Sequence, residues 1–153
     1  MNYQIMANIT DMAIGTNRNL AMPLRKHMAT TTIQILSSYT KQHSAEYQAQ
    51  AWIDLARKLF REHPTVSDPK RVRSVAIHTS HHTHDVIGSG AADPQKYDPG
   101  ASRETLDHSL PYIFAVALQD GTWHHEASYA RERATRPDTV ALWRKVSTVE
   151  DDE

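Results

Sequence analysis

The amino-acid sequence predicts an α+β fold: a small domain with a few-stranded sheet and amphipathic helices, followed by a helical C-terminal segment. Its 153 residues are 39% apolar, which is enough for one modest hydrophobic core. Residues 44–63 have the apolar spacing of a helix, whereas residues 71–80 alternate as a strand does. Two different periodicities in one short chain favour a mixed fold.

The first part of the chain gives one weak pattern and one strong pattern. The β-branched run "TTTIQIL", residues 30–36, predicts a strand, and the residues before it predict loop or frayed structure. Residues 44–63 predict a helix that Ser44 caps and that ends before Pro64. Its apolar stripe consists of Trp52, Leu55, Ala56, Leu59 and Phe60.

The strand predicted over residues 71–80 is expected to turn Val75 and Ile77 toward the core. After the histidine-rich stretch that follows, the sequence is dense in glycine, proline and aspartate, which predicts a loop of about 15 residues. Loops of that length are often functional.

A second helix is predicted over residues 102–121, with Ser102 as its N-cap and Gly121 at its end. Pro111 is expected to kink this helix, because proline removes an amide donor and crowds the carbonyl group one turn earlier.

The C-terminal part, residues 126–153, predicts two short helical segments that Pro137 separates. The final "EDDE" is expected to be a solvated acidic end.

Composition limits the classes of partner. Seventeen basic and eighteen acidic residues leave a net charge of -1, which gives no general attraction to nucleic acid or to an anionic membrane. No apolar run approaches the roughly 20 residues of a membrane span, and no signal peptide is apparent, so we expect a cytoplasmic protein. The absence of cysteine excludes disulfides, thiolate zinc sites and cysteine-ligated iron–sulfur clusters.

The stretch "HTSHHTHD", residues 78–85, places four histidines and an aspartate in eight positions. On a strand, His82 and His84 would share one face and could together grip a zinc ion. The other interpretation is that these are hydrogen-bonding side chains at a strand end. His108, which follows the long loop, belongs either to a polar helix face or to an anion-binding pocket.

Several unusual strings occur in the same order as in one protein family. They are "SAEYQAQAWIDLAR", "HTSHHTHDVIGSGAADPQKYDP", "ASRETLDHSLPYIFAVALQDGTWHHEASYARERA" and "DTVALWRKVSTVED". From about Ser44 to the end, the chain resembles the C-terminal part of the MmgE/PrpD family, which includes 2-methylcitrate dehydratases. Residues 1–43 match poorly.

The resemblance implies a small lid-type α+β domain that closes over the active site of a large all-helical domain. Residues 44–125 would form the smaller domain, and residues 126–153 would be a helical segment returning toward the all-helical domain, which has no counterpart here. Full-length relatives are expected to be homodimers.

The resemblance also implies a reaction. The family dehydrates 2-methylcitrate to 2-methylaconitate in propionate catabolism, the 2-methylcitrate cycle, and we expect no cofactor and no metal. The lack of cysteine agrees with chemistry that uses no iron–sulfur cluster. Such a dehydration needs a base, an acid, and cations or donors for a tricarboxylate.

Residues of this chain can be matched to those roles by the resemblance. Histidine suits proton transfer near neutral pH, and the expected catalytic residues are His82, His84 and His108. The expected substrate-binding residues are Arg103, Lys96 and, by a loose match, Lys41.

We expect the 153 residues to be inactive alone, because the resemblance assigns the main acid–base residues to the all-helical domain. The alternative is a stand-alone, small, histidine-rich domain that binds a metal or another ligand. Equilibrium dialysis with zinc separates the two hypotheses. Stoichiometric binding that a His82→Ala and His84→Ala double variant abolishes would favour the alternative.

Overall fold

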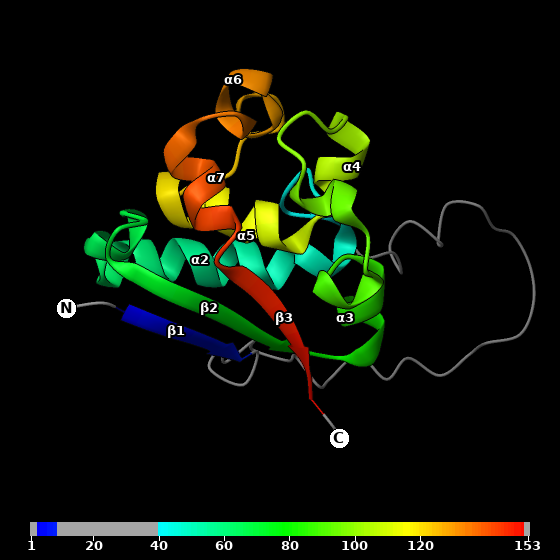
Figure 1. Ribbon diagram of the computed structural model, residues 1–153, viewed down its shortest axis with the longest axis horizontal. Coiled ribbons are helices and arrows are strands. Elements are labelled where there is room, and N and C mark those ends of the chain that lie inside the picture. Colours follow the sequence, from blue (N-terminus) through cyan, green and yellow to red (C-terminus); the bar gives the residue numbers. More distant parts are fainter. Residues whose placement is uncertain (1–2, 9–39, 152–153) are drawn as a thin grey trace, which may run out of the picture.

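The computed structural model describes residues 40–151 in full and residues 3–8 by their backbone. The described residues contain a three-stranded sheet in the order β1, β2, β3, and helices gather on one side of it (Figure 1). The strands are β1 (Tyr3–Asn8), β2 (Val72–Thr79) and β3 (Val146–Glu150). The mixed helix-and-sheet architecture confirms the predicted α+β class.

Both strand pairings are parallel, with β2 in the centre. Val75 and Ile77 are fully buried, as their alternation predicted. The prediction of loop or frayed structure near the N-terminus is wrong for Tyr3–Asn8, which pairs with β2 from Val72 to His78. The strand predicted over residues 30–36 lies outside the described residues.

The first long helix, α2 (Gln50–Glu62), confirms the helix predicted after Ser44, but it begins later. A short 3₁₀ turn (Tyr47–Ala49) precedes it, and there the Glu46 carboxylate, not Ser44, accepts the capping amide. Trp52, Leu55 and Ala56 are buried, which confirms the predicted face of the helix.

The helix predicted over residues 102–121 is two helices, α4 (Arg103–Asp107) and α5 (Leu110–Asp120). Ser102 caps the first, as expected. The kink expected at Pro111 is wrong, because Ser109 caps a new helix and Pro111 lies in its first turn, where no amide donor is needed. Gly121 ends α5 with φ 63°, a left-handed conformation that glycine adopts without strain.

Helix α5 is the centre of the core rather than an amphipathic surface helix. Every residue from Leu110 to Leu118 is buried. It packs against α2, α7 and β3. The aromatic ring of Tyr112 meets Trp143 edge to face at 4.9 Å between ring centroids, which links α5 to α7.

The C-terminal part contains α6 (Arg131–Ala134) and α7 (Pro137–Trp143), so the break at Pro137 is confirmed. The expectation of helix does not hold for Val146–Glu150, which is strand β3 beside β2. The core includes Leu142, Trp143 and Val146 together with residues before 125. The division of the chain at residue 125 stays a prediction.

The remaining helix, α3 (His81–Val86), and several 3₁₀ turns fill the connection from β2 to α4. The predicted long loop is therefore largely structured, with turns at Ser89–Ala91 and Pro94–Tyr97. Further 3₁₀ turns occur at Pro64–Ser67 and Ala127–Tyr129. None of the helices in the described part of the chain is long and apolar enough to cross a membrane.

Candidate functional site

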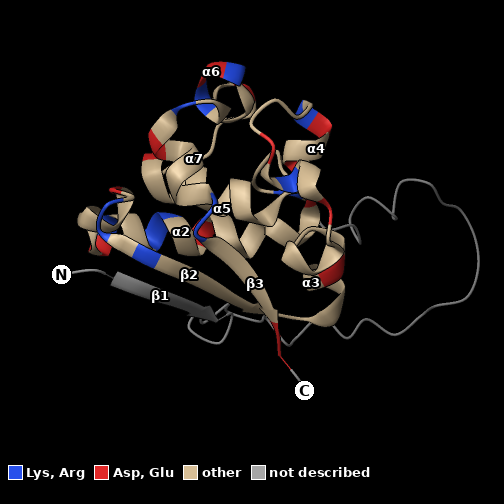
Figure 2. Cartoon of the chain, viewed as in Figure 1, with Lys and Arg blue, Asp and Glu red and all other residues tan. Residues whose placement is uncertain are grey.

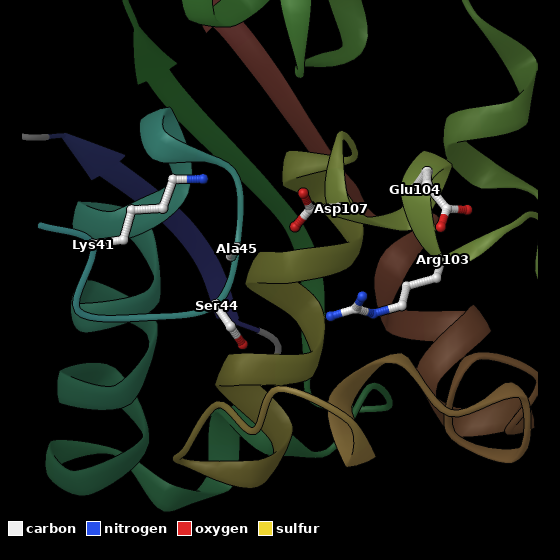
Figure 3. A pocket seen from close by; sticks show the side chains of 6 residues that line it. All are labelled: Lys41, Ser44, Ala45, Arg103, Glu104 and Asp107. Carbon is white, nitrogen blue, oxygen red and sulfur yellow. The ribbon is translucent and has the colours of Figure 1, made fainter.

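A surface pocket of about 190 Å³ lies between the segment that precedes α2 and the face of α4 (Figure 3). We call it the Lys41–Arg103 pocket. Its lining residues are Lys41, Ser44, Ala45, Arg103, Glu104 and Asp107. In Figure 3 the side chains of Lys41 and Arg103 extend from opposite sides toward Asp107, whereas the Glu104 carboxylate turns away. The pocket therefore presents two cations with a carboxylate between them.

Side chains of α2 fix the segment that carries Lys41 and Ser44. The Gln50 side chain accepts from the His43 amide at 2.8 Å and donates to the carbonyl oxygens of His43 and Ala45 at 3.0 and 3.1 Å. The buried His43 ring also bonds Asp54, with 2.9 Å between Nε2 and Oδ1. The start of α2 thus holds one wall of the pocket in place.

Helix α4 supplies the opposite wall. Arg103 and Asp107 are four residues apart and so lie on the same face of the helix. The Arg103 guanidinium stands 4.9 Å from the centre of the Tyr129 ring, and its Nη2 donates to the His125 carbonyl oxygen at 3.1 Å. These contacts occupy one face and one nitrogen of the guanidinium and leave its other donors for a ligand.

Tyr129 lies behind the pocket and contacts both walls. Its hydroxyl donates toward the carboxylate of Asp107 and lies 3.0 Å from the Ser44 carbonyl oxygen. Burial, reinforced by the Asp107 carboxylate, raises the pKa of Tyr129 far above its ordinary value. The phenol therefore stays protonated and acts as a hydrogen-bond donor throughout the physiological range.

The second carboxylate of the pocket belongs to Glu104, and the start of α4 determines its charge. Hydrogen bonds from its own backbone amide, and then from the Ser102 hydroxyl, hold the pKa of Glu104 below its usual range. Glu104 is consequently ionised near neutral pH, and it lines a second pocket as well.

The second pocket, of about 280 Å³, contains two of the residues predicted from the sequence, Lys96 and His108. Its lining residues are Asp93, Lys96, Glu104, Thr105 and His108. The ammonium of Lys96 donates to the carbonyl oxygens of Val86 and His108 at 2.6 and 2.7 Å, and burial lowers its pKa. Lys96 thus ties the end of α3 to the end of α4 and has limited freedom to bind a carboxylate.

His108 ends α4 and is exposed. Its Nδ1 donates to the Glu104 carbonyl oxygen at 2.9 Å, which fixes the hydrogen on that nitrogen in the neutral ring. The other ring nitrogen, Nε2, is then the one able to accept a proton.

His82 and His84 do not lie on a strand, as the sequence hypothesis assumed. Residues 81–86 form helix α3 with Ser80 as its N-cap, so side chains two residues apart point to different sides. His82 is exposed, whereas His84 Nδ1 is hydrogen-bonded to the Thr148 hydroxyl at 2.6 Å. Neither residue lines the two pockets described above.

The histidine stretch contacts the end of β3. In Figure 2 the red colour of acidic residues marks the end of β3 and part of helix α3. The pairs are His78 with Asp151 (2.9 Å), His81 with Glu150 (3.0 Å) and His84 with Thr148 (2.6 Å). Within the described ranges, no group of three or more histidine, aspartate or glutamate side chains is arranged to hold a metal ion. The zinc hypothesis required His82 and His84 on the same face of a strand, and helix α3 does not provide that arrangement.

The structure thus divides the six predicted site residues into three places. Lys41 and Arg103 share one pocket, Lys96 and His108 share its neighbour, and His82 and His84 lie on α3. Sequence reasoning missed Asp107 and Tyr129. The spacing of Arg103 and Asp107 could have indicated a shared face, but Tyr129 carries no local signal.

Together, the fold and the pocket define a small α+β domain that presents paired cations at its surface. The chain belongs to the MmgE/PrpD family, because residues 43–153 match the model of the MmgE/PrpD C-terminal domain. The matched range begins within one residue of the resemblance seen in the sequence. The search of solved structures found no significant match.

Proposed function

We propose that the chain is the substrate-binding C-terminal part of a cofactor-independent hydro-lyase that dehydrates 2-methylcitrate, or a closely related hydroxy-tricarboxylate, in the 2-methylcitrate cycle of propionate catabolism. Membership of the MmgE/PrpD family supports the class of enzyme. The observation that carries the proposal for this chain is the convergence of Lys41 and Arg103 on one pocket.

The chemistry of the pocket suits a hydroxy-tricarboxylate. Two carboxylates of the ligand would pair with Lys41 and Arg103, and the planar guanidinium favours a two-point contact. The ligand hydroxyl would donate to Asp107, which lies between the cations in Figure 3. A ligand without that hydroxyl would present only negative charge to the Asp107 carboxylate.

Proton transfer would need groups beyond this pocket. Within the proposal, the all-helical domain supplies the main acid and base, and His108 in the neighbouring pocket is the candidate from this chain, with Nε2 as its accepting atom. The catalytic assignment of His82 and His84 stays a prediction, and α3 places them outside both pockets.

Calorimetric titration of the purified chain with citrate tests the proposal. We expect Lys41→Met and Arg103→Met each to weaken citrate binding about tenfold, because each removes one charge-assisted contact. The matched control is Arg144→Met, since Arg144 is an exposed cation at the end of α7 that lines neither pocket. Citrate binding that resists both pocket substitutions, or no citrate binding at all, would refute the proposal.

A further inference from the structure

We propose that Tyr129 is a positioning residue of the Lys41–Arg103 pocket, whose hydroxyl keeps Asp107 from pairing with Arg103 and so leaves the guanidinium available to a ligand carboxylate. The inference rests on the proposed function in one respect, namely that the ligand is a polycarboxylate. The geometry on which it depends is independent of that function.

Without the Tyr129 hydroxyl, the Asp107 carboxylate could pair with the Arg103 guanidinium of the same helix and neutralise it. Arg103 and Asp107 lie on the same face of α4, one turn apart, at a spacing where arginine and aspartate form ion pairs. No such pair occurs between them among the described salt bridges. Instead, each is engaged by Tyr129, the carboxylate by its hydroxyl and the guanidinium by its ring face.

Tyr129 is itself firmly held. Its side chain is 6% exposed, and its ring meets Trp123 edge to face at 5.0 Å between centroids. Its hydroxyl also lies 3.0 Å from the Ser44 carbonyl oxygen, and Trp123 Nε1 donates to that same oxygen at 3.3 Å. Tyr129 therefore holds the two walls of the pocket together. It also engages both charged side chains of α4 that line the pocket, Asp107 and Arg103.

Removing the hydroxyl alone separates this role from packing. In Tyr129→Phe the ring under Arg103 remains, but Asp107 loses its donor and can turn to the guanidinium. We expect citrate affinity to fall about tenfold, the effect of losing one charge-assisted contact. Tyr97→Phe is the matched control, because the Tyr97 hydroxyl also donates to a backbone carbonyl, that of Val146 at 2.8 Å, and Tyr97 lines neither pocket.

A double-mutant cycle with Asp107→Asn distinguishes positioning from general destabilisation. In the Asp107→Asn background no free carboxylate can compete for Arg103, so Tyr129→Phe should lower citrate affinity less than about twofold. Equal losses in both backgrounds, or equal losses in Tyr129→Phe and Tyr97→Phe, would mean that Tyr129 only supports the fold and would overturn the inference.

A measurement on the ligand-free chain tests the role of Tyr129 without relying on the proposed function. The Nε–Hε signal of Arg103 in an NMR spectrum should shift in Tyr129→Phe, as Asp107 becomes its partner, and should shift much less when Asp107 is asparagine. If wild-type chain binds no citrate, the proposed function fails while this shift still supports the role of Tyr129. An Arg103 signal that Tyr129→Phe leaves unchanged would overturn the role itself.

Discussion

At the scale of single residues, the histidine stretch fastens the end of β3 to the segment after β2. His84 contacts Thr148. Gly88, just after α3, lies so close to both residues that only glycine fits at its position. A Cβ atom on Gly88 would stand 2.4 Å from the Thr148 hydroxyl oxygen and 2.6 Å from the His84 carbonyl oxygen. Gly88 is therefore a position of close packing at the start of the stretch where the sequence predicted a loop.

The close packing at Gly88 predicts a specific instability. Gly88→Ala should lower the free energy of unfolding by about 2 kcal/mol, because the backbone of α3 cannot move aside without disturbing the contact with β3. Urea denaturation measures this. Gly100→Ala is the control, since the nearest atom to its Cβ would be Asp98 Oδ1 at 3.3 Å, and it should cost much less. Similar losses at both positions would contradict the packing argument.

His81 makes the same region sensitive to pH. Its ring nitrogens face two carboxylates, with Nε2 3.1 Å from Asp85 and Nδ1 3.0 Å from Glu150. The hydrogen bond to Glu150, and then the charge of Asp85, raise the pKa of His81 above its usual 6.5. A raised pKa in the folded state contributes stability below the unfolded pKa, and this is lost as pH rises through the folded pKa.

We therefore expect the wild-type chain to melt at a higher temperature than His81→Gln at pH 5.5, and expect the gap to shrink by pH 8.5. Thermal unfolding at both pH values measures it. His82→Gln, which changes the next residue on the exposed side of α3, should give no comparable change in the gap. A gap for His81→Gln that stays constant with pH would contradict the assignment of the two carboxylates.

At the scale of elements, a buried arginine joins three helices. Arg133 on α6 makes a two-point contact with Asp120 at the end of α5, at 2.9 and 3.0 Å, and also bonds Gln119 and, on α7, Thr139. Helix α6 has four residues and could not be stable by itself. Its position therefore depends on this guanidinium and on the burial of Ala134.

A lysine at position 133 cannot make the same set of contacts. Arg133→Lys should lower the free energy of unfolding by about 2 kcal/mol, because an ammonium cannot reproduce the planar fork with which the buried guanidinium contacts Asp120, Gln119 and Thr139 at once. Arg136→Lys is the control, since its ion pair with Asp138 is half exposed and its loss should cost less than about 0.5 kcal/mol. Urea denaturation of both variants checks the prediction, and equal effects would contradict it.

At the scale of the whole molecule, the described residues build one core around α5 and leave the charged pocket at the surface. The walls of the pocket come from the segment before α2 and from α4, and the loop after α5 supports them. Within the proposed function, this pocket binds the carboxylates of the substrate, and turnover requires the acid–base residues of the all-helical domain.

We accordingly expect the purified chain to bind citrate but to release no 2-methylaconitate from 2-methylcitrate, measured by the ultraviolet absorbance of the new double bond. The wild-type chain with 2-methylcitrate omitted gives the baseline for this assay. Robust turnover would mean that this chain contains a complete active site and would contradict the division of roles between two domains.

Local patterns in the sequence predicted most of the helices and the central strand. The spacing of Trp52, Leu55 and Ala56 predicted α2, and Val75 and Ile77 predicted the buried face of β2. The break of the second helix was harder to predict, because the Ser109 hydroxyl that caps α5 also donates to the carbonyl oxygen of Lys96, and no local pattern indicates that contact. Strand β3 was missed because its partner, β2, lies about 70 residues earlier in the chain.

The sequence by itself determined the α+β class and the family, since these depend on local periodicity and on ordered strings. Through the resemblance it also named Lys41 and Arg103 as expected substrate-binding residues. The tertiary structure alone decided which charges meet. Lys41 and Arg103 line one pocket because the segment before α2 and helix α4 lie on opposite sides of it, and Asp107 accepts a hydrogen bond from Tyr129, which comes from a later part of the chain. Contacts between distant segments depend on packing, which no local pattern encodes.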